Sequence, residues 1–278
     1  MARGKKRVNQ ISVMNRRIKQ GRGQGQGKKY LPWLKVQDGP SEGFLIRSLG
    51  WTTGRVHHLL SMLEDSYFCL LDWSKDVVDI REQYPLLPLR RTLEIADRLG
   101  IKHPSHPRSG QPIVMTTDFL IDVQTSEGIK TLARTVKPAD KLTSVRVIEK
   151  FEIERTFWAE HGIDWGIVTE REIDKYSALA NNVRVLHKSW DTDNLPFQAL
   201  EHFYKIERLL YEQVSVRQVP PARSAGYVDD QLGLKPGSAL SAFKHFLARR
   251  IWCVDMKKPL DFSRPMIVKR NPKGVRDE

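Results

Sequence analysis

The chain has 278 residues, of which 40% are hydrophobic, enough to fill the core of one large domain or of two modest ones. Its 46 Lys and Arg residues outnumber the 33 Asp and Glu residues, and the net charge of +13 favours a polyanionic partner such as nucleic acid or an anionic membrane surface. No apolar run approaches the roughly 20 residues that cross a bilayer, and no signal-peptide core follows the basic N-terminus, so we expect a cytoplasmic protein without a membrane partner.

The N-terminal segment is strongly basic. Residues 1–37 contain eleven Lys or Arg and no acidic residue, with a Gly/Gln-rich stretch from Gly21 to Gly27. Such a segment cannot bury a core, so we expect residues 1 to about 30 to form a mobile arm that becomes ordered against phosphates, although a merely solubilising tail is an alternative. Tyr30 and Trp33 indicate that the arm docks onto the domain near Pro32. The expected DNA contacts of the arm are Arg16, Arg17, Lys19, Arg22, Lys28 and Lys29.

An apolar stripe at three- and four-residue spacing predicts a helix from about Gly54 to Leu71, and Glu64 lies on it. The same helix would carry Arg55 and the adjacent pair His57 and His58. Consecutive helix positions point about 100° apart, so the pair is a poor metal chelate, and we expect it on the helix surface or facing DNA together with Arg55. The distant cysteines Cys69 and Cys253 indicate neither a disulfide framework nor a zinc site.

The middle of the chain alternates between strands and helices. We expect an extended piece over Val77–Pro85, a helix over Arg91–Leu99 and an irregular loop over Lys102–Pro112. Two strands rich in β-branched or apolar residues follow, Val114–Val123 and Thr131–Lys137.

An amphipathic helix is predicted over Leu142–Glu160, and Ile163–Thr169 is a further buried strand. The order of elements indicates an α/β domain with a mixed sheet flanked by helices over residues 1–172. The line of residues expected on one side of the long helix is Ile148, Phe151, Arg155 and Trp158.

After about Glu170 the pattern becomes helical, and residues 173–278 are expected to form a second, mainly α domain. Three helices followed by a hairpin are typical of a winged helix-turn-helix. The candidate helices are Phe197–Gln213, Arg223–Leu232 and Gly237–Arg250, and the hairpin would pair Ile251–Met256 with Pro265–Val268.

Three residues carry the candidate chemistry. Asp118 lies in an otherwise apolar strand, where a carboxylate is costly unless it is paired or bound to a metal. Lys137 ends the next strand, so the two side chains reach one cleft if the strands are hairpin neighbours, and Glu64 supplies a second carboxylate. Each signal alone is weak, because a helix Glu or a strand-end Lys is usually solvated. Phosphodiester hydrolysis nevertheless needs this set: acidic oxygens that hold a divalent metal, and a group that polarises water.

In combination, a helix Glu, a strand Asp and a strand Lys within a basic α/β chain resemble the core of the restriction-endonuclease-like PD-(D/E)xK nucleases. Longer strings resemble the N-terminal domain of the TnsA family, the endonuclease subunits of heteromeric transposases. They run in order from about Arg16 to Ile173, and beyond them the chain matches the family mainly in layout. The strings are RRIKQGRGQGQGKKYLPWLKVQ, TTGRVHHLLSMLE, VVDIREQYPLLP, GIKHP, MTTDFLID, TVKPA, EKFEIERTFW and GIDWGIVTEREI.

The resemblance implies an active site of Glu64, Asp118 and Lys137. Glu64 and Asp118 would ligate Mg²⁺, or Mn²⁺ in its place, with the carbonyl of Val136 as a further ligand, and Lys137 would orient the water and stabilise the developing charge. Many family members have Glu or Gln two residues before the Lys. Here Thr135 stands at that position, and a hydroxyl is a weaker ligand for a second metal.

The family role implied for the chain is the cut of the 5′ strand at the transposon ends of double-stranded DNA, in the bacterial cytoplasm. A TnsB-like transposase of the integrase type would cut and join the 3′ strand, so that the element moves by cut and paste. The winged-helix-like domain would also contact a TnsC-like AAA+ ATPase regulator. A basic edge on its last helix suits phosphate contact, although an ordinary solvated face is equally compatible. The residues of this edge are Lys235, Lys244, His245, Arg249 and Arg250.

Two other functions are compatible with the sequence. The chain would be a non-catalytic, DNA-binding regulatory subunit of a transposition or other DNA-processing complex if only the arm and the winged helix were functional. It would be an RNA- or ribosome-associated basic protein if single-stranded RNA stacked on Trp33 or Trp51.

Overall fold

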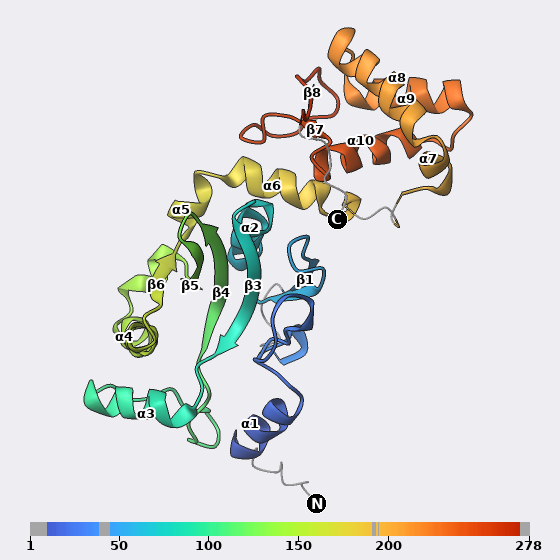
Figure 1. The fold of residues 1–278 in the computed structure, drawn as a ribbon. Coiled ribbons are helices and arrows are strands. Elements are labelled where there is room, and N and C mark those ends of the chain that lie inside the picture. The colour runs from blue at the N-terminus through green and yellow to red at the C-terminus, as the bar shows by residue number, and fades with distance from the viewer. Residues whose placement is uncertain (1–9, 39–44, 191–192, 194, 273–278) are drawn as a thin grey trace, which may run out of the picture. The chain divides into compact units, whose positions relative to one another are not determined.

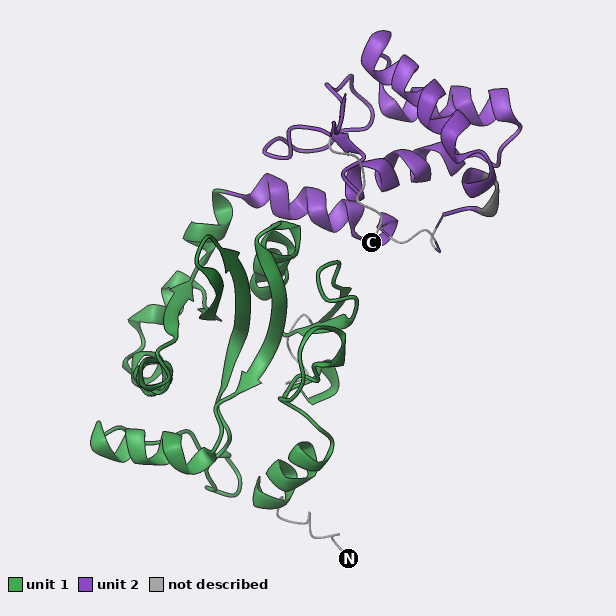
Figure 2. Cartoon of the chain, in the orientation of Figure 1, with its two compact units in different colours: residues 1–175 green, residues 176–278 purple. Residues whose placement is uncertain are grey.

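The computed structural model describes residues 10–38, 45–190, 193 and 195–272 (Figure 1). The chain divides into two units, residues 1–175 and 176–278, coloured separately in Figure 2. Residues 1–9 of the expected basic arm lie outside the described residues. Among the described residues, no helix combines the length and the apolar character needed to cross a membrane.

A four-stranded mixed sheet forms the centre of the first unit, and the four strands expected from the sequence are confirmed with small changes in their bounds. Their order is β3-β4-β5-β6. The first three strands are antiparallel, with β4 and β5 joined as a hairpin, and β6 runs parallel to β5 after the crossover through the long helix. The strands are β3 Val77–Pro85, β4 Thr116–Thr125, β5 Gly128–Val136 and β6 Asp164–Val168.

Helices cover both faces of this sheet (Figure 1). One face packs against α2 (Met62–Trp73), and the other packs against α3 (Leu89–Arg98) and α4 (Val145–Glu160), while the short α5 (Glu170–Asp174) follows β6. The α2-side cluster consists of Leu59, Phe68, Leu71, Val77, Ile80, Phe119, Ile121, Val136, Val168 and Ile173. The α4-side cluster consists of Leu86, Ile95, Ala96, Met115, Leu120, Ala133, Ile153, Phe157 and Trp158.

The helix predicted from Gly54 to Leu71 is wrong in its first part. Strands β1 (Ile46–Leu49) and β2 (Val56–Leu59) form an antiparallel hairpin there, and α2 begins only at Met62. In β2 the buried residues alternate with accessible ones, as in a strand with one covered face. The apolar stripe that predicted one helix therefore belongs partly to strand β2 and partly to helix α2.

The N-terminal segment is folded where the structure describes it, so the expectation of a mobile arm is wrong for residues 10–30. Helix α1 (Gln10–Lys19) is followed by turns. Tyr30 and Trp33 are each only 1% exposed, which agrees with the prediction that they dock the segment onto the domain. The glycine run was expected to belong to this mobile arm. Its glycines instead occupy left-handed backbone conformations, which favour glycine over residues with a side chain. Their φ values are +74° at Gly21, +76° at Gly23, +88° at Gly25 and +52° at Gly27.

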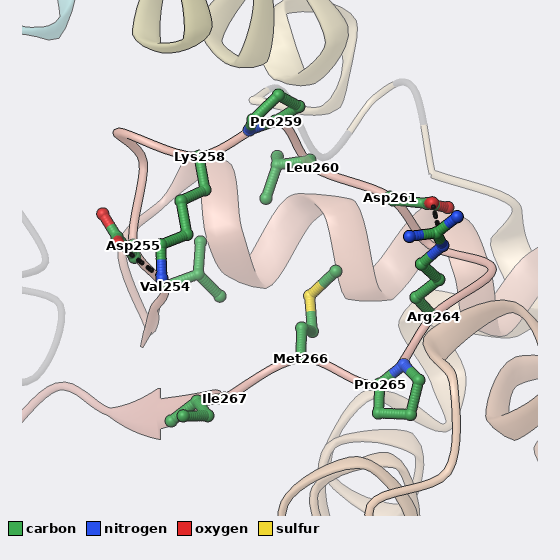
Figure 3. Close-up of a pocket in the computed structure, with 10 residues that line it drawn as sticks. All are labelled: Val254, Asp255, Lys258, Pro259, Leu260, Asp261, Arg264, Pro265, Met266 and Ile267. Atoms are coloured by element: carbon green, nitrogen blue, oxygen red, sulfur yellow. Dashed lines mark ion pairs between the residues drawn. The ribbon is translucent and has the colours of Figure 1, made fainter.

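The second unit is mainly helical: among its described residues, five α-helices precede a two-stranded antiparallel sheet, where three helices were expected. The expected helix Phe197–Gln213 is divided into two helices. The hairpin pairs Trp252 and Cys253 with Arg270 and Lys269, so the expectation of its second strand at Pro265–Val268 is wrong. The chain between its two strands lines an open pocket of about 520 Å³, formed by residues of the 254–267 segment (Figure 3). The helices are α6 Ser177–Leu186, α7 Phe197–Glu201, α8 Phe203–Tyr211, α9 Pro221–Leu232 and α10 Ser238–Ala248, and the strands are β7 Trp252–Cys253 and β8 Lys269–Arg270.

The basic edge expected on the last helix is largely engaged inside this unit. His245 is 3% exposed, and its Nδ1 lies 2.7 Å from the carbonyl oxygen of Ser189. The Lys244 ammonium lies 5.2 Å from the centre of the Phe262 ring. Arg249 stacks at 4.6 Å over Trp190, and Arg250 is half-buried, so Lys235 alone of the five residues is exposed. Helix α10 therefore buries His245 in the core of the unit, while Lys244, Arg249 and Arg250 are half-buried, and phosphate contact by these residues stays a prediction.

Candidate active site

The side chains of Glu64 and Asp118 meet at one point in the first unit, although one comes from α2 and the other from β4. The Nε2 of Gln83 lies 3.4 Å from Glu64 Oε2 and 3.2 Å from Asp118 Oδ1. The backbone N–H of Val136 donates to Asp118 Oδ2 at 2.8 Å. Lys137 follows directly and is close enough for its positive charge to lower the pKa of Asp118. The residues expected to form the site are therefore neighbours in space.

The first turn of α2 fixes the Glu64 carboxylate. Ser61 caps the helix by accepting a hydrogen bond from the Glu64 N–H at 3.1 Å, and its hydroxyl donates to Glu64 Oε1 at 3.1 Å. The N–H of Leu60 donates to Glu64 Oε2 at 2.9 Å. A Ser followed three residues later by Glu is the capping-box pattern, so the sequence Ser-Met-Leu-Glu already signals where this helix begins.

Strand β3 changes the face on which its side chains lie at Gln83. Ile80 belongs to the α2-side cluster, and strand alternation would place Tyr84, four residues later, on the same face. Tyr84 instead packs against the α4-side cluster, with its ring 5.8 Å from that of Trp158. The residue between them, Gln83, has a φ of 49°, a left-handed conformation that reverses the alternation.

Strand β4 makes the matching change at Asp118. Phe119 lies in the α2-side cluster, whereas the Thr117 hydroxyl, two residues away, receives a hydrogen bond from Trp158 Nε1 of α4 at 2.6 Å. Because both strands switch at the same level, Gln83 and Asp118 project together toward Glu64. This paired switch builds the site out of two otherwise regular strands.

Burial raises the pKa of both carboxyl groups. For Glu64 the negative charge of Asp118 raises the pKa further, whereas hydrogen bonds from Leu60, Ser61 and Gln83 oppose the rise. For Asp118 burial is the largest cause, and the Val136 N–H, Gln83 and the Lys137 charge oppose it. The buried carboxylate of Glu64 and the half-buried carboxylate of Asp118 face one amide, and a divalent cation would neutralise this donor set. Within the described ranges, no three His, Cys, Asp or Glu side chains gather as metal ligands, so such a cation would also draw on main-chain oxygen and water.

Glu154 of α4 is a further buried carboxyl group, and it was not predicted from the sequence. Its Oε1 accepts hydrogen bonds from Thr117 Oγ1 at 2.7 Å, from Trp165 Nε1 at 2.9 Å and from the Thr135 hydroxyl. Burial raises the pKa of Glu154 to about 7, and the charge of Asp118 also raises it. Thr135, the departure from the family pattern, is thus engaged with Glu154.

Glu154 was missed because the buried side of α4 was misplaced. Of the expected line, Ile148 is 46% exposed, and Arg155 pairs with Glu152 at 2.6 Å near the surface. The buried residues of α4 are Ile153, Glu154, Phe157 and Trp158. A stripe through Glu154 and Trp158, four residues apart, would have placed this Glu in the interior.

Arg55 and His57 lie in the interior, which contradicts the DNA contact expected for them. Both bind the carboxylate of Glu82, which is fully buried. Arg55 donates to both carboxylate oxygens, from Nη1 to Glu82 Oε1 at 2.9 Å and from Nη2 to Glu82 Oε2 at 2.6 Å. His57 Nδ1 lies 2.8 Å from Glu82 Oε2. Although burial opposes it, the charges of His57 and Arg55 hold the pKa of Glu82 well below its usual range. His58 is half-buried, and its Nδ1 accepts the Val36 N–H at 3.3 Å.

The basic residues of the N-terminal segment fall into two groups. Arg17 and Arg22 turn back onto the protein: Arg17 lies 5.5 Å above the Trp33 ring, and both pair with Asp38. Four other basic residues for which DNA contact was expected are exposed to solvent. These exposed residues are Arg16, Lys19, Lys28 and Lys29.

Comparison with known proteins matches both units. The family model described as TnsA-like endonuclease N terminal matches residues 74–170, and the one described as TnsA endonuclease C terminal matches residues 172–256. The chain is similar to the Transposon Tn7 transposition protein TnsA of Escherichia coli, with 39% identity over 248 residues, 89% of this chain and 87% of that protein. The first match includes Asp118 and Lys137 but begins after Glu64, so the place of Glu64 in the site rests on its contacts.

Proposed function

Because the chain belongs to the family of TnsA endonucleases, we propose that it is the endonuclease subunit of a heteromeric transposase and hydrolyses phosphodiester bonds at transposon ends with the help of Mg²⁺. The observation that carries this proposal is the meeting of Glu64 and Asp118 at the Gln83 amide, beside Lys137. A nuclease needs two such carboxylates and a neighbouring cationic side chain at the phosphate.

Each residue has a distinct part in the reaction. Glu64 and Asp118, with the carbonyl of Val136, would hold the cation. When bound, Mg²⁺ neutralises the phosphate and lowers the pKa of a bound water. Lys137 orients the attacking water and stabilises negative charge as it develops on the phosphate. The Val136 N–H donates to Asp118 Oδ2 at 2.8 Å, which fixes the orientation of this carboxylate. Mn²⁺ would substitute, because oxygen ligands accept both ions.

Thr135 supports a site for one cation. Its hydroxyl is bonded to Glu154, so it does not add a carboxylate to the pair formed by Glu64 and Asp118.

The strand and the partners follow from the family resemblance. We propose that the chain cuts the 5′ strand, while a TnsB-like transposase processes the 3′ strand and a TnsC-like AAA+ ATPase regulates both, which gives cut-and-paste movement. The name of the Escherichia coli relative, a transposition protein, supports this role. The DNA phosphates would contact the exposed basic residues of the N-terminal segment, with Arg16 and Lys19 on α1 and Lys28 and Lys29 beyond it.

The test is strand cleavage of a plasmid that carries the transposon ends, with the full-length chain and its partner subunits in Mg²⁺. Asp118→Asn and Lys137→Ala are expected to lose at least about 100-fold in cleavage rate and to keep DNA binding, since each removes charge at the reacting phosphate. Lys130→Ala, at an exposed position on the same strand as Val136, is the matched control and should cut normally. Cleavage that survives in Asp118→Asn would place the chemistry elsewhere. DNA binding without any cleavage by the wild type would favour a regulatory subunit.

A further inference from the structure

Gln83 has an unusual combination of backbone and burial. Its φ of 49° lies in the left-handed region, which residues with a Cβ rarely adopt, and its side chain is only 2% exposed. A buried glutamine in this conformation persists only where the surroundings determine it, and such residues concentrate at functional sites.

The N-terminal segment holds the backbone at this position. The N–H of Trp33 donates to the carbonyl oxygen of Gln83 at 3.2 Å, and the Tyr30 hydroxyl donates to the carbonyl oxygen of Glu82 at 3.1 Å. Two successive carbonyls of β3 are thus bonded to the segment that precedes the sheet. These two hydrogen bonds hold the backbone of β3 where Gln83 adopts its positive φ.

The side chain of Gln83 then links the two candidate metal ligands. Its Nε2 has two N–H groups and lies within hydrogen-bond distance of both Glu64 Oε2 and Asp118 Oδ1. Its Oε1 accepts the Thr116 hydroxyl at 3.3 Å, which sets the amide with the nitrogen toward the carboxylates. No other described residue is hydrogen-bonded to both carboxylates.

We propose that Gln83 is a positioning residue of the nuclease site: its amide keeps the carboxylates of Glu64 and Asp118 facing each other, so that a divalent cation finds them already oriented. This inference rests on the proposed function, because it assigns Gln83 a part in the same metal site. Groups that orient metal ligands without touching the metal contribute strongly to affinity.

The experiment measures Mg²⁺ binding by the full-length chain, with the metal alone, by titration calorimetry. Gln83→Gly removes the amide but keeps a residue that adopts positive φ readily. We expect its affinity for Mg²⁺ to fall about 10- to 100-fold while the circular dichroism spectrum is unchanged. Plasmid cleavage by the variant should recover as Mg²⁺ is raised, which loss of structure would not allow. The matched control is Gln218→Gly in the second unit, at a glutamine with a φ of 56°, and it should bind Mg²⁺ as the wild type does.

A second variant keeps the test decisive if Gln83→Gly does not fold. Gln83→Asn retains an amide and tolerates the left-handed conformation, but it is one methylene shorter, so it should bind Mg²⁺ more weakly than the wild type, and wild-type affinity in this variant would also overturn the inference. Wild-type affinity in Gln83→Gly would overturn the inference and leave the nuclease proposal standing. A wild-type chain that binds no Mg²⁺ and cuts no DNA would overturn the proposed function itself.

Discussion

The backbone N–H of Trp33 is hydrogen-bonded to the carbonyl oxygen of Gln83, whose side chain contacts both candidate metal ligands. The basic N-terminal segment is therefore part of the structure around the site, in addition to any contact that it makes with DNA. Substitutions in the turns of this segment should therefore alter the position of Gln83 as well as the stability of the first unit.

Replacement of Gly23 by Ala should destabilise the first unit. A Cβ at this position would lie 2.3 Å from Pro85 Cγ, and the φ of +76° is unfavourable for Ala. The matched control is Gly54→Ala, which has a φ of +63° but no atom within 4 Å of the new Cβ. We expect the control to lose about 1 kcal/mol of unfolding free energy from the backbone alone, and Gly23→Ala to lose clearly more. Urea denaturation measures both losses. Equal losses would show that Gly23 does not pack against Pro85 in solution.

Replacement of Arg55 by Ala should cost about 3–5 kcal/mol of unfolding free energy, because it leaves the buried carboxylate of Glu82 without its bidentate partner. Lys28→Ala, at an exposed position, should stay within about 0.5 kcal/mol of the wild type. Chemical denaturation checks the contrast. If Arg55→Ala were as stable as the wild type and lost DNA affinity instead, Arg55 would be a phosphate contact.

Glu154 should make the metal-free protein less stable as the pH rises. Its pKa is about 7 in the folded chain against an ordinary 4.5, so between these values the folded state holds more protons than the unfolded state, and stability falls with increasing pH. Glu154→Gln removes this titration, and its unfolding free energy relative to the wild type should grow by about 1–3 kcal/mol between pH 5 and pH 8. Denaturation at the two pH values, without metal, measures the change. A constant difference would mean that Glu154 titrates normally.

Paired lysines test the proposed DNA contact. The double variant Lys28→Ala/Lys29→Ala should bind DNA more weakly, and the slope of log affinity against log salt should decrease in magnitude by about 2, as expected for two lost phosphate contacts. Lys257→Ala/Lys258→Ala removes the same charge from another exposed lysine pair and should leave the slope unchanged. Fluorescence anisotropy with labelled DNA at several salt concentrations gives both slopes. The same slope in both double variants would argue for general electrostatic attraction.

The regular strands and the site residues Asp118 and Lys137 could be predicted from the sequence, because short apolar runs in the neighbouring residues indicate them. The apolar runs around Asp118 and before Lys137 gave β4 and β5 nearly in full. Where local signals were shared between structures, prediction failed: the residues around His57 and Leu59 fit both a helix stripe and a strand alternation, and a strand formed.

Polar residues in the interior could not be predicted from local pattern. Arg55 is buried because Glu82 is buried beside it, and Glu154 because Thr117 and Trp165 donate to it, and each partner comes from another part of the chain. For Gln83 the sequence gives no sign of a left-handed backbone, since that conformation depends on its surroundings. Such placements are properties of the assembled fold.

Side-chain alternation reverses at Gln83 in β3 and at Asp118 in β4, at the same level of the sheet. Neither strand can therefore gain or lose a residue near this point without disturbing the site. One residue inserted or deleted between Ile80 and Tyr84 would send every later side chain of β3 to the wrong face, and β4 has the same limit around Asp118. The turn at Thr125–Gly128 and the 102–112 loop have no such restriction. Chimeric nuclease domains should therefore be joined in these connections, and relatives that differ in length should differ there as well.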